Sequence, residues 1–240
     1  MNKPLVVILA VIAFVVAGAI YVGHSAYRAL ALGEFCTGCT QVNNGGPMIT
    51  GSGHVVTENR AVLPFTAVRA ETAVEVVIDR TGAASLSVTA DDNLVSFLTA
   101  EVRDGTLYLA DAKGKSFQTK KAVYHVTVAD LRAIECRGSG DVEVNHLNNR
   151  ALTATVEGSG EVKLTGHADD FVLTVKGSGD VDTAELVAKR VKVVMSGSGD
   201  VKVNAADSLD IQMTGSGELE YVGSPKITKQ VHGSGSVMHK

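Results

Sequence analysis

The sequence predicts an all-β fold, a narrow parallel β-solenoid with one coil per about 19 residues, preceded by an N-terminal transmembrane helix. Three observations predict it. Gly-Ser-Gly recurs at a regular spacing, apolar and polar residues alternate between the recurrences, and the chain opens with a long uncharged segment. Self-similarity at a fixed period is the signature of a repeat architecture.

Three regions differ in composition: a membrane anchor or signal segment at 1–32, a flexible linker at 33–53, and a solenoid domain at 54–240, whose repeats occupy 138–240. Residues 5–22 carry no charge. As a helix they would span ~27 Å, close to the ~30 Å of a bilayer core. A cleaved signal peptide needs only ~7–15 apolar residues. We therefore favour an uncleaved inner-membrane anchor that contacts the lipid bilayer and carries an exported domain, periplasmic or extracellular.

The linker contains Cys36 and Cys39 in a C-x-x-C spacing, among Gly, Asn and Pro residues. A redox pair of this kind is expected next to a βαβ unit, and a zinc site needs four ligands. A local disulfide or two thiols beside the membrane is the favoured interpretation. A redox or assembly role remains an alternative.

Gly-Ser-Gly begins at Gly51, Gly138, Gly158, Gly177, Gly197, Gly215 and Gly233, and the last six starts are 20, 19, 20, 18 and 18 residues apart. Aligned on the first Gly, three columns are mostly apolar. The column four residues after it reads Val142, Val162, Val181, Val201, Leu219 and Val237. Apolar columns alternate with polar ones, as expected for strands with one buried face. Each repeat therefore contains a strand that enters the turn and a strand that leaves it.

An antiparallel meander would show the same alternation, and a charged column distinguishes the two. Five residues after the first Gly stand Glu143, Lys163, Asp182, Lys202 and Glu220, whose charges alternate at every step. Alternation stabilises the fold only if equivalent residues are direct neighbours. In a parallel coil they stack ~4.8 Å apart, with Val, Leu, Ile and Met between two facing sheets.

The last coil differs from the others in ways expected for the end of a stack. Lys229 and His239 occupy inward columns, Pro225 removes a backbone donor, and Ser236 replaces the acid of the turn. Polar residues and a missing donor make a sheet edge less prone to pairing.

The region before the repeats is also predicted to be β-rich, and we expect it to form wider coils at the other end. Asp104-Gly105 is a turn signal, and Asp91-Asp92-Asn93 is predicted to cap one short helical turn. The expected strands are 73–79, 85–90, 106–111 and 123–128.

Composition excludes some partners. The chain holds 22 basic and 26 acidic residues, a net charge of −4, which argues against nucleic acid. Aromatic residues make up 5% and Trp is absent, so there is little stacking surface for bases or sugar rings.

The stretches GSGHVVTENRAVLPFTAV and DDNLVSFLTAEVRDGTLYL, followed by reiterated GSGDVEV, GSGEVKL and GSGDVKV, carry a resemblance. From about Gly51 to Lys240 the chain resembles the bacterial head GIN domain family of autotransporter-adhesin-like proteins. The resemblance implies a single-stranded right-handed β-helix at the cell surface or in the periplasm. It also implies no known catalytic residues.

The strongest candidate site is a ladder of turn acids, three residues after each first Gly: Asp141, Glu161, Asp180, Asp200 and Glu218. Stacked carboxylates are suitable ligands for Ca²⁺. Acids in tight turns also accept hydrogen bonds from backbone N–H groups, and we favour this second interpretation. No residue is assigned as catalytic, cofactor-binding or metal-ligating, and no cofactor is predicted.

Two weaker candidates involve single residues. His146 and His167 fall near the second turn of adjacent coils, with Glu185 as a loose third ligand, but isolated surface histidines are favoured because metal sites need three or four ligands. Cys136 occupies an inward column and is predicted to be a small buried hydrophobe.

The sequence therefore favours a non-catalytic, membrane-anchored cell-envelope protein that acts in adhesion or surface binding, with a cell-surface glycan or protein as ligand. The alternative is a carbohydrate-active hydrolase or lyase that uses carboxylates of the ladder. A catalytic pair of carboxyl groups needs environments that give the two groups different pKa values, whereas the carboxylates of the ladder lie in equivalent surroundings. Oligomerisation is compatible with either function.

Overall fold

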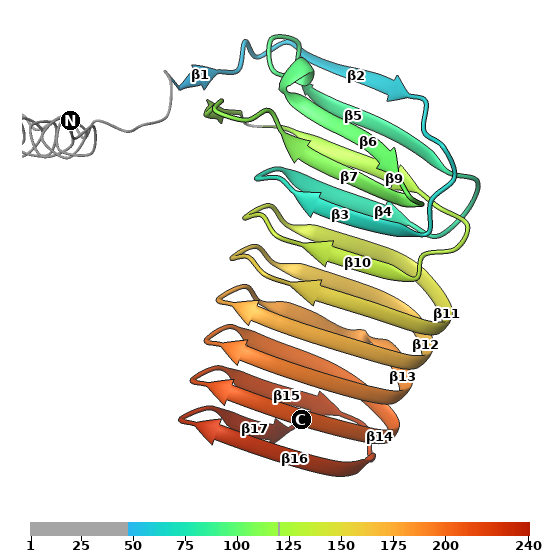
Figure 1. Cartoon of the computed structure of the whole chain (residues 1–240), viewed down its shortest axis with the longest axis vertical. Coiled ribbons are helices and arrows are strands. Elements are labelled where there is room, and N and C mark those ends of the chain that lie inside the picture. Colours follow the sequence, from blue (N-terminus) through green and yellow to red (C-terminus); the bar gives the residue numbers. More distant parts are fainter. Residues whose placement is uncertain (1–47, 120) are drawn as a thin grey trace, which may run out of the picture. The chain divides into compact units, whose positions relative to one another are not determined.

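The computed structural model describes residues 48–119 and 121–240 (Figure 1). The strands before the repeats are β1 (Ile49–Thr50), β2 (Val55–Arg60), β3 (Ala67–Glu71), β4 (Glu75–Asp79), β5 (Ser85–Asp91), β6 (Leu98–Arg103), β7 (Thr106–Asp111), β8 (Phe117–Gln118) and β9 (Val123–Thr127), with one 3-10 turn, η1 (Val95–Phe97). The repeat region contains β10 (Ala133–Cys136), β11 (Val142–Val156), β12 (Val162–Gly177), β13 (Val181–Gly197), β14 (Asp200–Gly215), β15 (Glu218–Val222), β16 (Lys226–Gly233) and β17 (Ser236–His239).

The predicted anchor at 1–32, its apolar segment 5–22, and Cys36 and Cys39 lie outside the described residues. Within the part of the chain that is described, no helix is long and apolar enough to cross a bilayer. Within the predicted linker, β1 pairs in parallel with β8.

The repeats form a parallel solenoid, as predicted. β11 to β14 each leave one Gly-Ser-Gly turn, bend through a second turn at the opposite end of the coil, and run into the next Gly-Ser-Gly turn (Figure 1). The register is that of stacked repeats: Val142 pairs with Val162, Val162 with Val181, and Val181 with Val201. All these pairings are parallel, so the meander is excluded.

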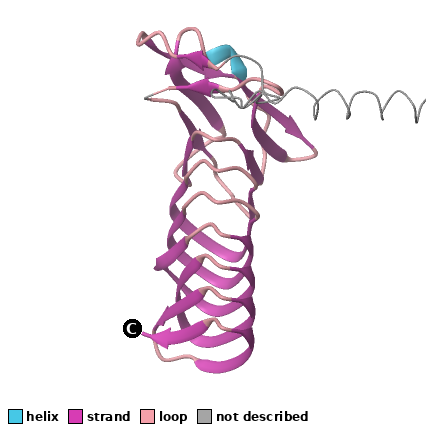
Figure 2. Cartoon of the chain, turned by 90° about the vertical axis from the view of Figure 1, so that its left-hand side faces the viewer, coloured by secondary structure: helices cyan, strands magenta, loops and turns pink. Residues whose placement is uncertain are grey.

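The Gly-Ser-Gly turns lie in line along the stack (Figure 2). They pack so closely that a side chain on the first Gly does not fit. A Cβ built on Gly158 would lie 1.9 Å from the carbonyl oxygen of Gly138, and one on Gly197 would lie 1.9 Å from that of Gly177. The motif is therefore explained by backbone contact between successive coils.

Each coil contributes one strand to each of two faces. The inbound face holds β10, the second halves of β11 to β14, and β16, which run into Gly-Ser-Gly turns, and β3, β7 and β6, which continue the same sheet toward the N-terminal end. The outbound face holds the first halves of β11 to β14, β15 and β17, which leave Gly-Ser-Gly turns, and β4, β9, β5 and β2, which continue the same sheet toward the N-terminal end. Between the faces lies one apolar core, in which Leu173, Val193 and Ile211 are fully buried.

The stack does not follow the chain order throughout. β3 and β4 form a coil that pairs on one side with β10 and β11 and on the other side with β7 and β9. This coil comes first in the chain but lies between two later ones. All four strands predicted before the repeats are present, as β4, β5, β7 and β9, and the Asp104-Gly105 turn joins β6 to β7.

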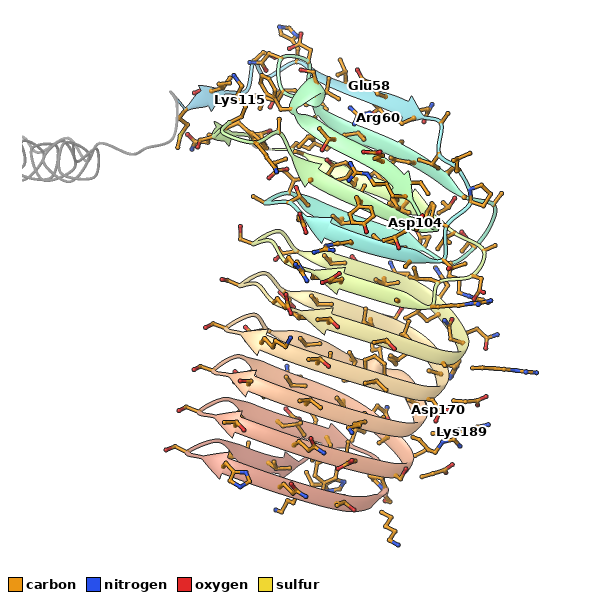
Figure 3. All side chains as sticks on the ribbon, in the orientation of Figure 1. Glu58, Arg60, Asp104, Lys115, Asp170 and Lys189 are labelled. Atoms are coloured by element: carbon orange, nitrogen blue, oxygen red, sulfur yellow. The ribbon has the colours of Figure 1, made fainter. Side chains whose placement is uncertain are left out.

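Antiparallel strands close the N-terminal end of the stack, where β2 pairs with β5 and β6 pairs with β7. Arg60 ties this end together: its guanidinium donates to the backbone carbonyls of Val95 (2.8 Å) and Leu98, and it pairs with Glu58 at 3.1 Å (Figure 3). Charged groups thus cover an otherwise open end of the core.

The predicted capping role of Asp91-Asp92-Asn93 is wrong. The residue before η1 is Leu94, and no side chain caps the turn. The three side chains instead bind the Gly51-Ser52-Gly53 loop: Asp91 accepts from the Gly53 N–H at 2.8 Å, Asp92 accepts from the Ser52 hydroxyl at 2.5 Å, and Asn93 accepts from the Ser52 N–H at 3.0 Å. This loop lies 38 to 41 residues away in the chain, a distance at which local capping rules do not apply.

The last coil, β16 and β17, has the predicted register. Lys229 pairs with Ile211 of the inward column, and His239 pairs with Tyr221. The His239 ring lies 4.8 Å from the Tyr221 ring, and its Nε2 is 2.8 Å from the Gly223 carbonyl oxygen.

Candidate binding surfaces

The turn acids form the predicted column, and two contacts show what they do there. The Glu161 N–H donates to Oδ1 of Asp141, and the Asp200 N–H donates to Oδ1 of Asp180, both at 2.9 Å. Each carboxylate therefore satisfies a backbone donor of the next coil, which supports the turn interpretation over calcium binding. Across residues 48–119 and 121–240, no three His, Cys, Asp or Glu residues are arranged to hold a metal ion.

The alternating column on the outbound face is confirmed by the register, because Lys163 pairs with both Glu143 and Asp182, and Lys202 with both Asp182 and Glu220. The side chains do not all pair along the column. Lys202 lies 4.0 Å from Asp182, whereas the Lys163 ammonium turns to Glu185, 3.2 Å away. The hydrogen bond to Glu185 raises the pKa of Lys163, and the charges of Asp182 and Glu143 add to this shift.

A second charged column follows the inbound face beside the Gly-Ser-Gly turns. Glu157 lies between Arg137 (3.2 Å) and Lys176 (3.0 Å). The hydrogen bond from Lys176 lowers the pKa of Glu157, with smaller contributions from the two neighbouring arginines, Arg137 and Arg69. Alternating columns therefore place compensated charge on both faces.

The two histidines do not converge. His146 Nδ1 lies 3.3 Å from Asp79, whereas His167 lies in register between Asn148 and Val187. Glu185, the loose third ligand, pairs with Lys163 instead. Isolated surface histidines, the favoured interpretation, fit this arrangement.

Cys136 is buried, as predicted, and burial raises the pKa of its thiol to about 12. A thiol with this pKa is not ionised near neutral pH and is a poor nucleophile. It acts as a core side chain, next to Val156 and Ala70 on the neighbouring strands.

A row of ion pairs at the second turns was not predicted from the sequence. Arg190 binds Asp170 through two hydrogen bonds of 2.5 and 2.6 Å, and Lys189 lies 2.7 Å from Asp169. Figure 3 shows Asp170 and Lys189 beside each other at this rim. The residues of each pair are 20 apart in the sequence, which is the length of one coil, and this spacing could have indicated the ion pairs.

A hollow on the inbound face near the N-terminal end was not predicted from the sequence either. A cavity of about 420 Å³ lies over β6 and β7, with Tyr108, Glu101, Arg103 and Glu71 among its lining residues. Tyr108 of β7 lies directly between Glu101 of β6 and Arg69 of β3. The guanidinium carbons of Arg69 and Arg103 lie 5.7 and 5.6 Å from the centre of its ring.

The charges around this ring are paired. Arg103 pairs with Glu101, and Arg69 pairs with Glu71 (2.7 Å) and Glu135 (3.4 Å). Burial lowers the pKa of Arg69, but the charges of Glu135 and Glu71 outweigh this effect and raise it. The hydrogen bond from Arg103 lowers the pKa of Glu101. The site therefore combines an aromatic ring with fixed donors and acceptors.

Comparison with solved structures shows related folds. The chain has a TM-score of 0.67 and 28% identity with a putative adhesin from Bacteroides fragilis NCTC 9343, covering 80% of this chain and 100% of that one. It has a TM-score of 0.51 and 21% identity with a putative lipid binding protein from Parabacteroides distasonis ATCC 8503, covering 81% and 100%. A putative adhesin from the same organism gives 0.50 and 20%, with the same coverage.

A search of curated proteins finds no match to the chain. A family model does match. Residues 64–225, more than half of the chain, fit the model described as "Putative auto-transporter adhesin, head GIN domain". This range contains most of the stack, from the out-of-order coil β3–β4 to β15. The chain belongs to the head GIN domain family.

Proposed function

We propose that the protein is a non-catalytic envelope protein, anchored in the inner membrane by residues 5–22, whose exported solenoid acts in adhesion or surface binding. The observation that carries the proposal is the pair of long outer faces, held rigid by parallel pairing from β3 to β17. A rigid, extended surface is the binding element that solenoids typically provide.

The chemistry of these faces favours binding over catalysis. Asp141 and Asp180 are engaged by backbone N–H groups of the next coil, and Glu157 and Asp170 are held in ion pairs. Side chains with these fixed partners give a surface of defined charge pattern. A fixed charge pattern provides specificity and orientation in recognition.

The comparisons support the same function. The head GIN family carries an adhesin description, and the structure that is 28% identical is itself called a putative adhesin. Fold alone does not determine function, so the proposal must be tested on the faces themselves.

The test uses bacteria that display the full chain. We expect them to attach to immobilised host cells or envelope glycans, and we expect attachment to fall when outward side chains of one face are replaced. An inbound-face variant combines Thr174→Ala, Lys192→Ala and Gln212→Ala; a matched outbound-face variant combines Lys163→Ala, Lys202→Ala and Asn204→Ala. These positions project from the faces and are not in the core.

Full attachment by both variants, at unchanged surface levels and melting temperature, would contradict binding through the faces. The non-catalytic part of the proposal has a separate test. A polysaccharide-cleaving activity of the chain that disappears in Asp180→Asn and Asp200→Asn would overturn it and establish the hydrolase or lyase.

A further inference from the structure

The hollow beside Tyr108 differs from the rest of the inbound face. Along the row that contains Tyr108, the outward positions on the successive coils are Arg69, Glu135, Thr155, Thr174, Val194 and Gln212, none of them aromatic. A small residue deepens the surface next to the ring: Ala110 lines the cavity, and it pairs with Thr99 on one side and Glu71 on the other. A volume of about 420 Å³ falls in the ~300–1,000 Å³ range of small-molecule sites.

The polar groups that line the hollow are held in place by the fold. Asp111 accepts from the Thr72 hydroxyl at 2.6 Å and from the Ala73 N–H at 2.9 Å. The Thr99 hydroxyl donates to the carbonyl oxygen of Ala110 at 2.8 Å. These contacts fix the directions of the groups before any ligand arrives, which lowers the entropic cost of binding.

The charges of the site identify the class of ligand. Three carboxylates, Glu71, Glu101 and Asp111, and two cations, Arg103 and Lys113, line the hollow. Glu101 is paired with Arg103, and Glu71 is paired with Arg69 beside the ring. An anion that binds Arg103, or a cation that binds Glu101 or Glu71, would have to displace an existing ion pair, whereas a neutral ligand would not.

A neutral ligand that uses these groups needs an apolar side for the ring and several hydroxyls for the carboxylates and guanidiniums. Sugar rings have both features: C–H groups on one side contact an aromatic face, and hydroxyls both donate and accept hydrogen bonds. We propose that the cavity bounded by Tyr108, Glu101 and Arg103 binds a neutral saccharide unit of a surface glycan. This proposal rests on the proposed function, because it names the ligand class and one site on the binding face.

The experiment measures binding of neutral disaccharides, cellobiose, maltose and chitobiose, to the full chain in detergent by saturation-transfer NMR and calorimetry. We expect one of them to bind, and we expect Tyr108→Ala to weaken it about tenfold or more, as for an aromatic anchor. Tyr108→Phe should bind within about threefold of the parent chain because it retains the ring. Ala110→Ile should abolish binding by filling the hollow while the ring stays in place.

The matched control is Thr155→Ala, an outward residue on the same row of the inbound face, which should leave binding unchanged. Melting curves check that each variant is folded. Binding of none of the three disaccharides by the parent chain would overturn the proposal, as would unchanged binding by both Tyr108→Ala and Ala110→Ile. If the displaying bacteria still attach in either case, only the saccharide site fails; loss of attachment altogether would mean that the proposed function fails.

Discussion

Gly197→Ala tests whether close contact between coils explains the Gly-Ser-Gly motif. A Cβ at this position would lie 1.9 Å from the carbonyl oxygen of Gly177 and within 3.0 Å of its carbonyl carbon and nitrogen. Because all three are backbone atoms, no rotamer change relieves the overlap, and the turn itself must move. Two hydrogen bonds pass through this turn, from the Ser198 N–H to the Gly177 carbonyl and from the Ser216 N–H to the Gly197 carbonyl, each 3.1 Å.

The magnitude follows from these contacts. Overpacking costs about 1–3 kcal/mol, and each lost hydrogen bond contributes about 1 kcal/mol net. We therefore expect the free energy of unfolding to fall by about 3–5 kcal/mol when both bonds are lost. In a domain of this size, 1 kcal/mol corresponds to about 2–4 °C, so the melting temperature should fall by about 10 °C.

Thermal melts of the full chain followed by circular dichroism make the measurement. Gly82→Ala is the matched control, because a Cβ there meets no atom within 4 Å and the backbone φ is not positive. Ser198→Ala tests the middle of the motif; its side chain is exposed, and we expect a change within about 0.5 kcal/mol. A Gly197→Ala melting temperature within about 2 °C of that of Gly82→Ala would refute the contact explanation.

Three further predictions concern charge and burial. Glu157→Lys places a third cation between Arg137 and Lys176. The melting temperature should fall at low salt and recover at about 1 M NaCl. A loss that does not depend on salt would contradict stabilisation by the alternating charges of this column. Asp91→Ala removes the acceptor for the Gly53 N–H and the Thr119 hydroxyl; we expect a loss of about 2 kcal/mol in urea unfolding, with faster hydrogen exchange at Gly53. Burial raises the pKa of Cys136 to about 12, so above about pH 9 the folded state holds a proton that the unfolded state loses, and stability should fall by up to about 1.4 kcal/mol per pH unit. Cys136→Val should remove this component, and equal slopes for both proteins between about pH 9 and 10 would contradict it.

The coil register could be predicted from the sequence because every coil buries side chains at equivalent positions and places charged side chains next to those of the neighbouring coils. The column that begins with Val142 is apolar in every repeat, and the signs of Glu143, Lys163 and Asp182 alternate. Only stacking of equivalent residues makes both patterns favourable, and the observed pairing of Lys163 with Asp182 confirms it.

The out-of-order coil β3–β4 could not be predicted in the same way. Its turn has no Gly-Ser-Gly; Thr72 and Ala73 form it, and Asp111 from another strand binds both. The Gly-Ser-Gly turn at Gly138 stacks directly on this turn, with the Thr72 carbonyl oxygen 1.9 Å from a Cβ built on Gly138. A contact between residues that far apart leaves no periodic signal in the chain.

The hollow at Tyr108 was missed for a related reason. Low aromatic content argues against stacking surfaces in general, but it says nothing about where a single ring lies. Arg69 and Arg103 reach Tyr108 only because β3 pairs with β7 and β6 folds back on it. The candidate site therefore depends on the part of the topology that sequence periodicity does not encode.

The two ends of the stack are protected by different physical means. At the N-terminal end, antiparallel strands cover the core, and the Arg60 guanidinium donates to the backbone carbonyls of Val95 and Leu98. At β16 the inward positions Ile227 and Val231 are 37% exposed, and Lys229 lies between them on the same inward side of the strand. A further coil stacked on β16 would have to bury the Lys229 ammonium in an apolar column, and burial of an unpaired charge is strongly unfavourable. A single inward lysine thus opposes edge-to-edge growth, which an all-apolar column at this position would favour.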